Sequence, residues 1–166
     1  MKKLYIAYGH NLNKERMQRR CSQTANPIAV ATLKDHRLVF QGRLNSARAN
    51  VIHAKGFEVP VGVWEISDAD EHRLDIYERV DEGLRTKKYV EIEVNGERKE
   101  ALIYFMLPSP YGIPSDGYLK TIAEGYKDFN LPAIALNEAV ALAYEKTVMN
   151  GSWIHTYENA VPGPAQ

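Results

Sequence analysis

The sequence predicts a single α+β domain, and three observations carry this prediction. Residues 89–94 alternate between apolar and polar side chains, Asn95-Gly96 follows, and residues 101–107 form a second apolar run, which indicates a β-hairpin because both turn residues tolerate positive φ. Apolar residues recur with helical spacing over residues 68–80. They do so again after Pro132, which fits the first turn of a helix. The chain has 166 residues, which suits one core, and we place the domain in residues 1–150 and a tail in residues 151–166.

Charge and composition disfavour several kinds of partner. Lys plus Arg and Asp plus Glu both number 21, so no net field favours nucleic acid, an anionic membrane or an acidic protein, and we expect a small-molecule ligand. One cysteine, Cys21, excludes an internal disulfide framework. The apolar run after Met1-Lys2-Lys3 is too short for a signal peptide or a membrane span, which predicts a cytoplasmic protein. The sequence leaves the oligomeric state open.

The first element is a strand that ends at a glycine and leads into a helical pattern, in the stretch Tyr5-Ile6-Ala7-Tyr8-Gly9-His10-Asn11-Leu12. Glycine permits positive φ and close backbone approach, and N–H groups at a helix start have no partner within the helix. The turn therefore predicts a cradle for a carboxylate or a phosphate. A turn that only reverses the chain is the simpler reading of the same residues.

A short helix is expected next. Asn13 can cap it, and Met17 and Cys21 share its inner face at i,i+4 spacing. Cys21 then reads as a core residue more readily than as a nucleophile. The remaining basic residues are expected to point outward as a solvated face, with phosphate contact as the alternative: Arg16, Arg19 and Arg20.

Strands occupy the next part of the chain. Residues 28–33 and 37–41 read as two strands of a hairpin joined at Lys34-Asp35-His36, and residues 49–52 and 59–66 return to strand character. Pro60 predicts that the last strand begins at an edge or a bulge.

Ser67 and Asp70 form an S-x-x-D helix start, which places a helix over about residues 68–80. Asp75, Glu78 and Glu82 are spaced i, i+3, i+7, so they share one face if that helix persists. An acidic solvated face is the simpler reading, and a catalytic carboxylate is the alternative. After the hairpin, two further helices are expected, one through Tyr118 and Tyr126 and one that follows Pro132 and stops near Asn150-Gly151.

Motifs for nucleotide loops, zincin sites and the hydrolase elbow are missing from the sequence. The five histidines lack ligand spacing, so we expect no metal and no cofactor. These histidines are His10, His36, His53, His72 and His155.

Five short motifs follow one another along residues 3–137: Tyr8-Gly9-His10-Asn11-Leu12, Gly62-Val63-Trp64-Glu65-Ile66, Leu74-Asp75-Ile76-Tyr77-Glu78, a strand led by Tyr89, and Pro114-Ser115-x-x-Tyr118. In this order they resemble the γ-glutamylcyclotransferase family. The resemblance implies a small mixed β-barrel-like sheet with helices packed on the outside. It also implies that Glu78 is the catalytic general acid and base. The implied substrate-binding residues are Tyr8, Gly9, His10, Asn11, Leu12, Tyr89 and Tyr118.

The activity implied is ring closure of a γ-glutamyl amine or peptide to 5-oxoproline with release of the amine. A carboxylate in a partly dry pocket is expected to have a raised pKa. Two features depart from the family pattern: His10 replaces the usual serine, and residues 81–88 are a charged insertion. Two questions stay open, namely which γ-glutamyl compound is the substrate and whether the chain is instead a non-catalytic domain that binds a carboxylate.

Overall fold

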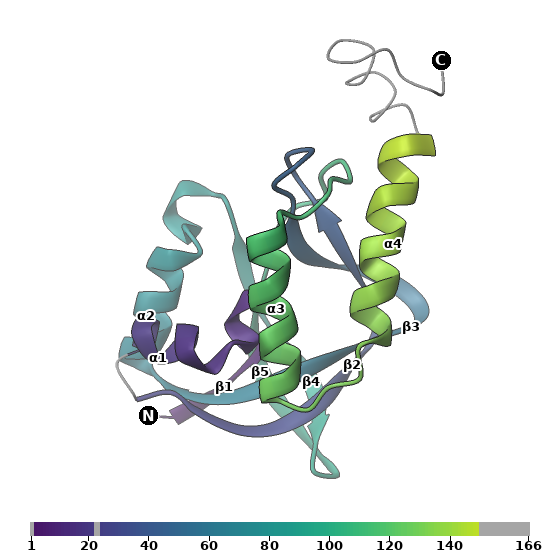
Figure 1. Ribbon diagram of the computed structural model, residues 1–166. Coiled ribbons are helices and arrows are strands. Elements are labelled where there is room, and N and C mark those ends of the chain that lie inside the picture. Colours follow the sequence, from purple (N-terminus) through teal and green to yellow (C-terminus); the bar gives the residue numbers. More distant parts are fainter. Residues whose placement is uncertain (1, 22–23, 150–166) are drawn as a thin grey trace.

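The computed structural model describes residues 2–21 and 24–149 and confirms the α+β class. A five-stranded sheet has the order β2-β3-β1-β5-β4, in which β1 pairs antiparallel with β3 and parallel with β5 (Figure 1). The strands are β1 (Lys2–Ala7), β2 (Asn26–Gln41), β3 (Arg48–Ser67), β4 (Thr86–Val94) and β5 (Glu97–Phe105). The helices are α1 (Lys14–Cys21), α2 (Asp68–Tyr77), α3 (Asp116–Asp128) and α4 (Ile134–Met149), with short 3₁₀ turns η1 (His10–Leu12) and η2 (Val80–Glu82).

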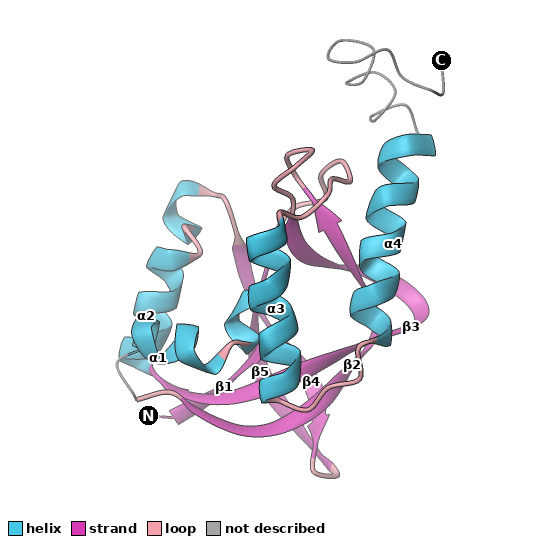
Figure 2. Cartoon of the chain, viewed as in Figure 1, coloured by secondary structure: helices cyan, strands magenta, loops and turns pink. Residues whose placement is uncertain are grey.

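The sheet curls strongly but stays open. Its edge strands β2 and β4 do not pair, although residues 32–36 and 90–93 line one cleft between them. The helices stand along the outside of this curved sheet (Figure 2). Trp64, Phe40, Ile6 and Leu12 are among the largest fully buried side chains, which places the core between the sheet and the helices.

The predicted β4–β5 hairpin is confirmed. Residues of β4 pair antiparallel with β5 from Thr86↔Phe105 to Val94↔Glu97. Asn95 has φ 52° and Gly96 has φ 84°, the positive values that the sequence predicted for this turn.

The predicted hairpin at Lys34-Asp35-His36 is wrong. β2 continues through these residues and pairs with β3 along its length, with a register shift between Lys34 and His36. Asp35 adopts φ 58°, and its carboxylate accepts a hydrogen bond from the Gly56 backbone N–H at 2.9 Å. The polar tripeptide therefore forms a bulge, and the chain reverses instead at residues 42–47.

Two other boundaries differ from the sequence prediction. Pro60 lies inside β3, opposite Thr32 of β2, so β3 does not begin at Pro60. Pairing of β3 with β1 ends two residues later, at Gly62. α2 ends at Tyr77 and not near residue 80. The predicted helix stop at Asn150-Gly151 and the tail 151–166 lie outside the described residues. Among the described residues, no helix has the length and apolar character that crossing a membrane requires.

Candidate active site

Glu78 is placed by the end of α2. The Ser67–Asp70 capping box that the sequence predicted fixes the start of this helix. The helix ends at Tyr77, Glu78 is its C-cap, and Arg79 follows with φ 55°, so the chain reverses at once. Glu78 is only 7% exposed. The helix stops before Glu78, so the condition for a common face of Asp75, Glu78 and Glu82 is not met.

A second segment, the glycine loop at residues 9–12, approaches Glu78 from the end of β1. The N–H groups of Leu12 and Asn13 donate to the carbonyl oxygens of Gly9 and His10, which closes one 3₁₀ turn. The N–H groups at the start of such a turn have no acceptor within it. The Trp64 indole N–H donates to the Asn11 carbonyl at 3.1 Å and ties the loop to β3.

Gly9 has φ −125°, so of the two properties that a glycine offers here, positive φ and close backbone approach, the turn does not use the first. The glycine instead allows the backbone of the loop to lie close to Ala49 and Tyr118. A Cβ on Gly9 would lie 3.2 Å from the Ala49 Cβ and 3.8 Å from the Tyr118 hydroxyl.

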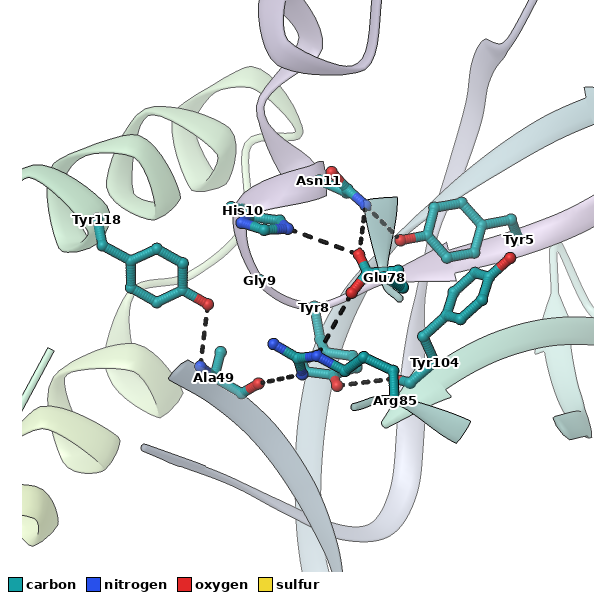
Figure 3. Close-up of a pocket in the computed structure, with 10 residues that line it drawn as sticks. All are labelled: Tyr5, Tyr8, Gly9, His10, Asn11, Ala49, Glu78, Arg85, Tyr104 and Tyr118. Atoms are coloured by element: carbon teal, nitrogen blue, oxygen red, sulfur yellow. Dashed lines mark hydrogen bonds and ion pairs between the residues drawn. The ribbon is translucent and has the colours of Figure 1, made fainter. Parts of the chain in front are cut away.

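Three side chains surround the Glu78 carboxylate (Figure 3). The Asn11 side-chain amide donates to Oε1 at 3.3 Å, His10 Nε2 lies 3.6 Å from Oε1, and Arg85 Nε lies 3.4 Å from Oε2. Within the part of the chain that the structure describes, no hydrogen bond or ion pair to this carboxylate is shorter than 3.3 Å. The carboxylate is thus held in place but keeps lone pairs for a ligand.

The sequence analysis missed two arginines at this site. Arg20 was expected to point outward, but it is buried, donates to the Asn11 side-chain oxygen and lies over the Tyr77 ring. Its spacing of three residues from Met17 was the signal that it lies on the inner face of α1. Arg85 is buried as well and donates to the Ala49 carbonyl at 3.3 Å. Nothing in the sequence of the charged stretch 81–88 distinguishes Arg85 from the charged residues around it.

A hollow opens beside Glu78. Its inner cavity is about 30 Å³, and the empty space is about 300 Å³ when its mouth is included. Six of the eight residues predicted for the site line it: Tyr8, Gly9, His10, Asn11, Glu78 and Tyr118. The other lining residues are Tyr5, Ala49, Arg85 and Tyr104.

Two predicted site residues lie elsewhere. Leu12 is fully buried in the core beneath the loop. Tyr89 is 46% exposed on β4, with its hydroxyl 3.4 Å from a Glu71 carboxylate oxygen, and it does not line the hollow. An alternating strand cannot tell from sequence alone which of its faces meets the site, and this is why Tyr89 was included.

Tyr118 supplies a hydroxyl on the opposite wall. This oxygen accepts a hydrogen bond from the Ala49 backbone N–H at 3.0 Å, so its own proton can be donated to a ligand. α3, which carries Tyr118, begins at a Ser115 cap whose side chain accepts from the Tyr118 N–H.

Comparisons with known proteins agree with this geometry. The model of the AIG2-like family matches residues 58–137. A solved structure described as a gamma-glutamyl cyclotransferase is 28% identical, with a TM-score of 0.77 over 85% of this chain and 88% of that one. Residues 58–137 are thus similar to the AIG2-like family, and the chain is similar in fold to a gamma-glutamyl cyclotransferase. The resemblance found in the sequence motifs is thereby confirmed.

Other members of this fold are more distant or less well described. An uncharacterized protein from Homo sapiens is 29% identical, with a TM-score of 0.73 over 84% of this chain and 86% of that one. A gamma-glutamyl cyclotransferase specific to glutathione from yeast is 10% identical with a TM-score of 0.58, over 86% of this chain and 96% of that one, and shows the fold alone. No protein of curated function matches the sequence. At the level of the family, the similarity to the structure described as a gamma-glutamyl cyclotransferase supports an enzyme of that type.

The described part of this AIG2-like chain contains no group of three or more His, Cys, Asp or Glu side chains that could hold a metal ion. The hollow offers an ionised carboxylate, the guanidinium group of Arg85, a hydroxyl donor and backbone N–H groups, and Arg20 lies behind Asn11 outside its lining. These groups suit a ligand that carries both a carboxylate and an amine.

The expected raised pKa of Glu78 is wrong. Burial does raise the pKa of this carboxyl, but contact with His10 and the charges of Arg85 and Arg20 outweigh burial and hold the pKa below its usual range. Glu78 is consequently ionised at neutral pH in the unliganded protein.

His10 is shifted in the direction that keeps it neutral. Burial lowers the pKa of the imidazole, and Arg20 lowers it further, although Glu78 opposes both. Arg20 Nη1 lies 3.2 Å from Nε2. A neutral ring accepts from Arg20 at Nε2 in one tautomer and donates from Nε2 toward Glu78 in the other, while Nδ1 is buried and has no partner in the described residues.

The lowered pKa of Glu78 predicts how folding stability depends on pH. A carboxyl whose pKa is lower in the folded state stabilises the protein above its ordinary value of 4.5 and loses this contribution as the pH falls through the folded-state value. We expect Glu78→Gln to unfold more easily than the parent at pH 7, with the difference shrinking below about pH 4.5. Urea unfolding of both proteins from pH 7 to pH 3 measures this. A difference that is constant or grows toward low pH would contradict it.

Proposed function

We propose that this protein is an enzyme that cyclises the γ-glutamyl group of a γ-glutamyl amine or peptide to 5-oxoproline and releases the amine. The observation that carries the proposal is the buried carboxylate of Glu78, which faces the glycine loop and Tyr118 across one hollow. The similarity to a gamma-glutamyl cyclotransferase supports the same reaction.

The chemistry requires a base that also returns its proton. The α-nitrogen of the substrate forms a bond to the γ-carbonyl carbon, and the bond from that carbon to the amide nitrogen breaks. Across the reaction the α-ammonium loses two protons and the leaving nitrogen gains two, so Glu78 can accept and return each in turn. A shuttle of this kind contributes about 10²- to 10⁴-fold to the rate.

The two arginines reconcile the low pKa of Glu78 with this role. In the free protein they keep the carboxylate ionised and ready to accept a proton. When the substrate's α-carboxylate enters, its negative charge offsets theirs, which raises the pKa of Glu78 toward the range useful for returning a proton. The inner cavity is small, so the α-amine would occupy it while the rest of the glutamyl chain fills the mouth.

The rest of the hollow would position the γ-carbonyl. Loop N–H groups and the Tyr118 hydroxyl are donors for the substrate carboxylate or for the oxyanion that develops on the γ-carbonyl. Each donor that serves the oxyanion is worth roughly 10²- to 10³-fold in rate. Holding the flexible chain in its ring-closing conformer supplies a further gain.

Incubation with a substrate panel tests the proposal. The panel contains γ-glutamyl amino acids, glutathione, γ-glutamylamines and a larger γ-glutamylated amine, and the assay detects 5-oxoproline. Release of 5-oxoproline from one or more compounds supports the proposal. Binding of these compounds by calorimetry without any 5-oxoproline would instead support the non-catalytic carboxylate-binding domain. A second negative charge at Glu78 argues against that alternative, because it would repel an anionic ligand.

The loop backbone, and not the His10 imidazole, is expected to make the main contact with the glutamyl end. Gly9→Ala should then lower kcat/KM by about 10-fold or more, because its Cβ meets Ala49 at 3.2 Å and crowds Tyr118. His10→Ser should change it by only about 3-fold or less, within the net value of a single hydrogen bond. Steady-state kinetics of both variants decides the point. An equal or larger loss in His10→Ser would show that the His10 side chain, and not the loop backbone, makes the contact that matters.

A further inference from the structure

Four tyrosines line the hollow, and their hydroxyl protons differ in what they bind. Tyr8 donates its hydroxyl proton to the Tyr104 carbonyl at 2.7 Å, and Tyr104 donates its own to the Asp75 carboxylate at 2.6 Å. Both protons are therefore committed to acceptors of the protein. The Tyr118 hydroxyl accepts from the Ala49 N–H, which leaves its proton for a ligand.

The fourth tyrosine, Tyr5, also has a free proton. Its hydroxyl accepts a hydrogen bond from the Asn11 side-chain amide at 2.9 Å, and a phenol that accepts one hydrogen bond still has its own proton to donate. Across residues 2–21 and 24–149 no hydrogen bond from this hydroxyl to an acceptor is present. Tyr5 is only 4% exposed, so bulk water has little access to it. Figure 3 shows the hydroxyl on the side of the ring that faces Asn11 and Glu78.

Arg20 and Asn11 fix the role of this hydroxyl. The Arg20 guanidinium donates to the Asn11 side-chain oxygen, which determines the orientation of the amide. The amide nitrogen then donates to the Tyr5 hydroxyl at 2.9 Å and to the Glu78 carboxylate at 3.3 Å. Tyr5 is thus the acceptor in its contact with Asn11, and its proton must go elsewhere. The same nitrogen holds Tyr5 and Glu78 next to each other.

Tyr5 keeps its proton at neutral pH. Burial raises the pKa of its hydroxyl, and the negative charge of Glu78 raises it further, although the hydrogen bond from Asn11 opposes both. The hydroxyl is therefore a hydrogen-bond donor and not a base. A buried donor that faces a reacting group stabilises negative charge where that charge develops.

We propose that Tyr5 is a catalytic residue whose hydroxyl donates a hydrogen bond to the γ-carbonyl oxygen of the substrate as ring closure makes this oxygen negative. This inference rests on the proposed function. Glu78 takes the proton of the attacking amine, and the γ-carbonyl carbon bonds to that amine, so the oxygen becomes negative in the part of the hollow next to Glu78. Tyr5 is held there, whereas Tyr118 lies on the opposite wall and stays available for the α-carboxylate.

No proton leaves Tyr5 in this step. When the new carbon–nitrogen bond forms, an electron pair of the carbonyl double bond moves onto the oxygen, and the Tyr5 hydrogen bond strengthens. When the bond to the leaving amine breaks, that pair returns and the double bond forms again. The hydroxyl therefore contributes most between the two bond changes, which predicts an effect on the rate and little effect on binding.

Tyr5→Phe removes only the hydroxyl and tests the assignment. We expect kcat to fall by roughly 10²- to 10³-fold, the range for the loss of one oxyanion donor. Substrate affinity should change by about 3-fold or less, within the net value of a single hydrogen bond. Release of 5-oxoproline from the γ-glutamyl compound that the parent converts fastest measures kcat. Calorimetry with this compound measures affinity in the slow Glu78→Gln background, with and without Tyr5→Phe.

Two further variants separate the hydroxyl from the packing of the ring. Tyr126→Phe removes the hydroxyl of another buried tyrosine, which has no hydrogen-bond partner in the described residues, and its kcat should equal that of the parent. Replacement of Tyr5 by 3-fluorotyrosine keeps the hydroxyl and its contact with Asn11, and it makes the hydroxyl a stronger donor. We expect kcat to stay at or above the parental value. A loss as large as that expected for Tyr5→Phe would overturn the assignment, and this variant decides the point if Tyr5→Phe does not fold.

Three results with Tyr5→Phe would also overturn it. The first is a parental kcat. The second is a loss of affinity as large as the loss of kcat, which would place the contact in the ground state. The third is a loss that disappears at higher pH, because Tyr5 would then act only through the protonation of Glu78. If the parent releases no 5-oxoproline from any compound, the proposed function fails and this assignment with it, whereas an active parent with an unaffected Tyr5→Phe rejects this assignment alone.

Discussion

Glu78→Gln is expected to lower kcat by about 10²- to 10⁴-fold. Glutamine keeps the size of the side chain and its hydrogen-bonding capacity, but it cannot accept a proton and return it. Arg85, Asn11 and His10 surround this position, so the substituted side chain should stay in place. Ligand binding and the folded state should survive, although stability falls at neutral pH. Steady-state release of 5-oxoproline measures kcat, and calorimetry measures the affinity for the substrate. Together they show whether the substitution lowers the rate without weakening binding.

Glu82→Gln is the matched control. It makes the same chemical change four residues later, where the carboxylate is exposed and pairs with Arg79 at 3.0 Å. Its activity should equal that of the parent. Asp75→Asn should have an intermediate effect at most, because Asp75 accepts from the Tyr104 hydroxyl at 2.6 Å and acts on the hollow only through that ring. Parental turnover in Glu78→Gln, or an inactive Glu82→Gln, would show that the catalytic residue is misassigned.

Gly125→Ala is expected to damage both the fold and the site. A Cβ at this position of α3 would lie 2.6 Å from the Leu12 Cβ and 2.7 Å from the Asn13 backbone nitrogen. Those atoms belong to the base of the glycine loop, and backbone cannot move aside as a flexible side chain can. Overpacking of this kind costs about 1–3 kcal/mol of unfolding free energy. Because the loop must shift to relieve it, kcat/KM should also fall by about 10- to 100-fold.

Gly117→Ala provides the control in the same helix. A Cβ there meets no atom within 4 Å, so the substitution should be neutral or should stabilise α3 by up to about 1 kcal/mol. Urea unfolding and kinetics of the two variants are compared directly. If Gly125→Ala matched Gly117→Ala in both measurements, the helix would not support the loop in the way that the structure indicates.

Local sequence was sufficient where neighbouring residues decide the structure. Asn95-Gly96 determines the β4–β5 hairpin because its turn needs two residues that tolerate positive φ. Ser67 and Asp70 determine the start of α2 through hydrogen bonds only three residues apart. At the candidate site, the loop at residues 9–12 and Glu78 were predicted from motifs that resemble the family, and Gly9, His10, Asn11 and Glu78 line one hollow.

Local sequence gave the wrong prediction where a segment is compatible with two conformations and contacts with distant residues select one of them. Lys34-Asp35-His36 suits a turn or a bulge equally well, and pairing with β3 selects the bulge. A helix through residue 80 is compatible with the sequence, yet the chain reverses at Arg79. The pKa of Glu78 was misjudged for the same reason, because burial was foreseen but the buried Arg20 and Arg85 were not.

The sequence by itself therefore determined the α+β class, the hairpin, the cap of α2 and the segments that carry the site. Only the tertiary structure decided the parallel pairing of β1 with β5, the approach of Glu78 to a loop far away in sequence, and the inward direction of two arginines. The physical reason is the range of the interactions. Turns and caps depend on hydrogen bonds between near neighbours, whereas sheet order, burial and the field at a carboxylate depend on groups that meet only when the core closes.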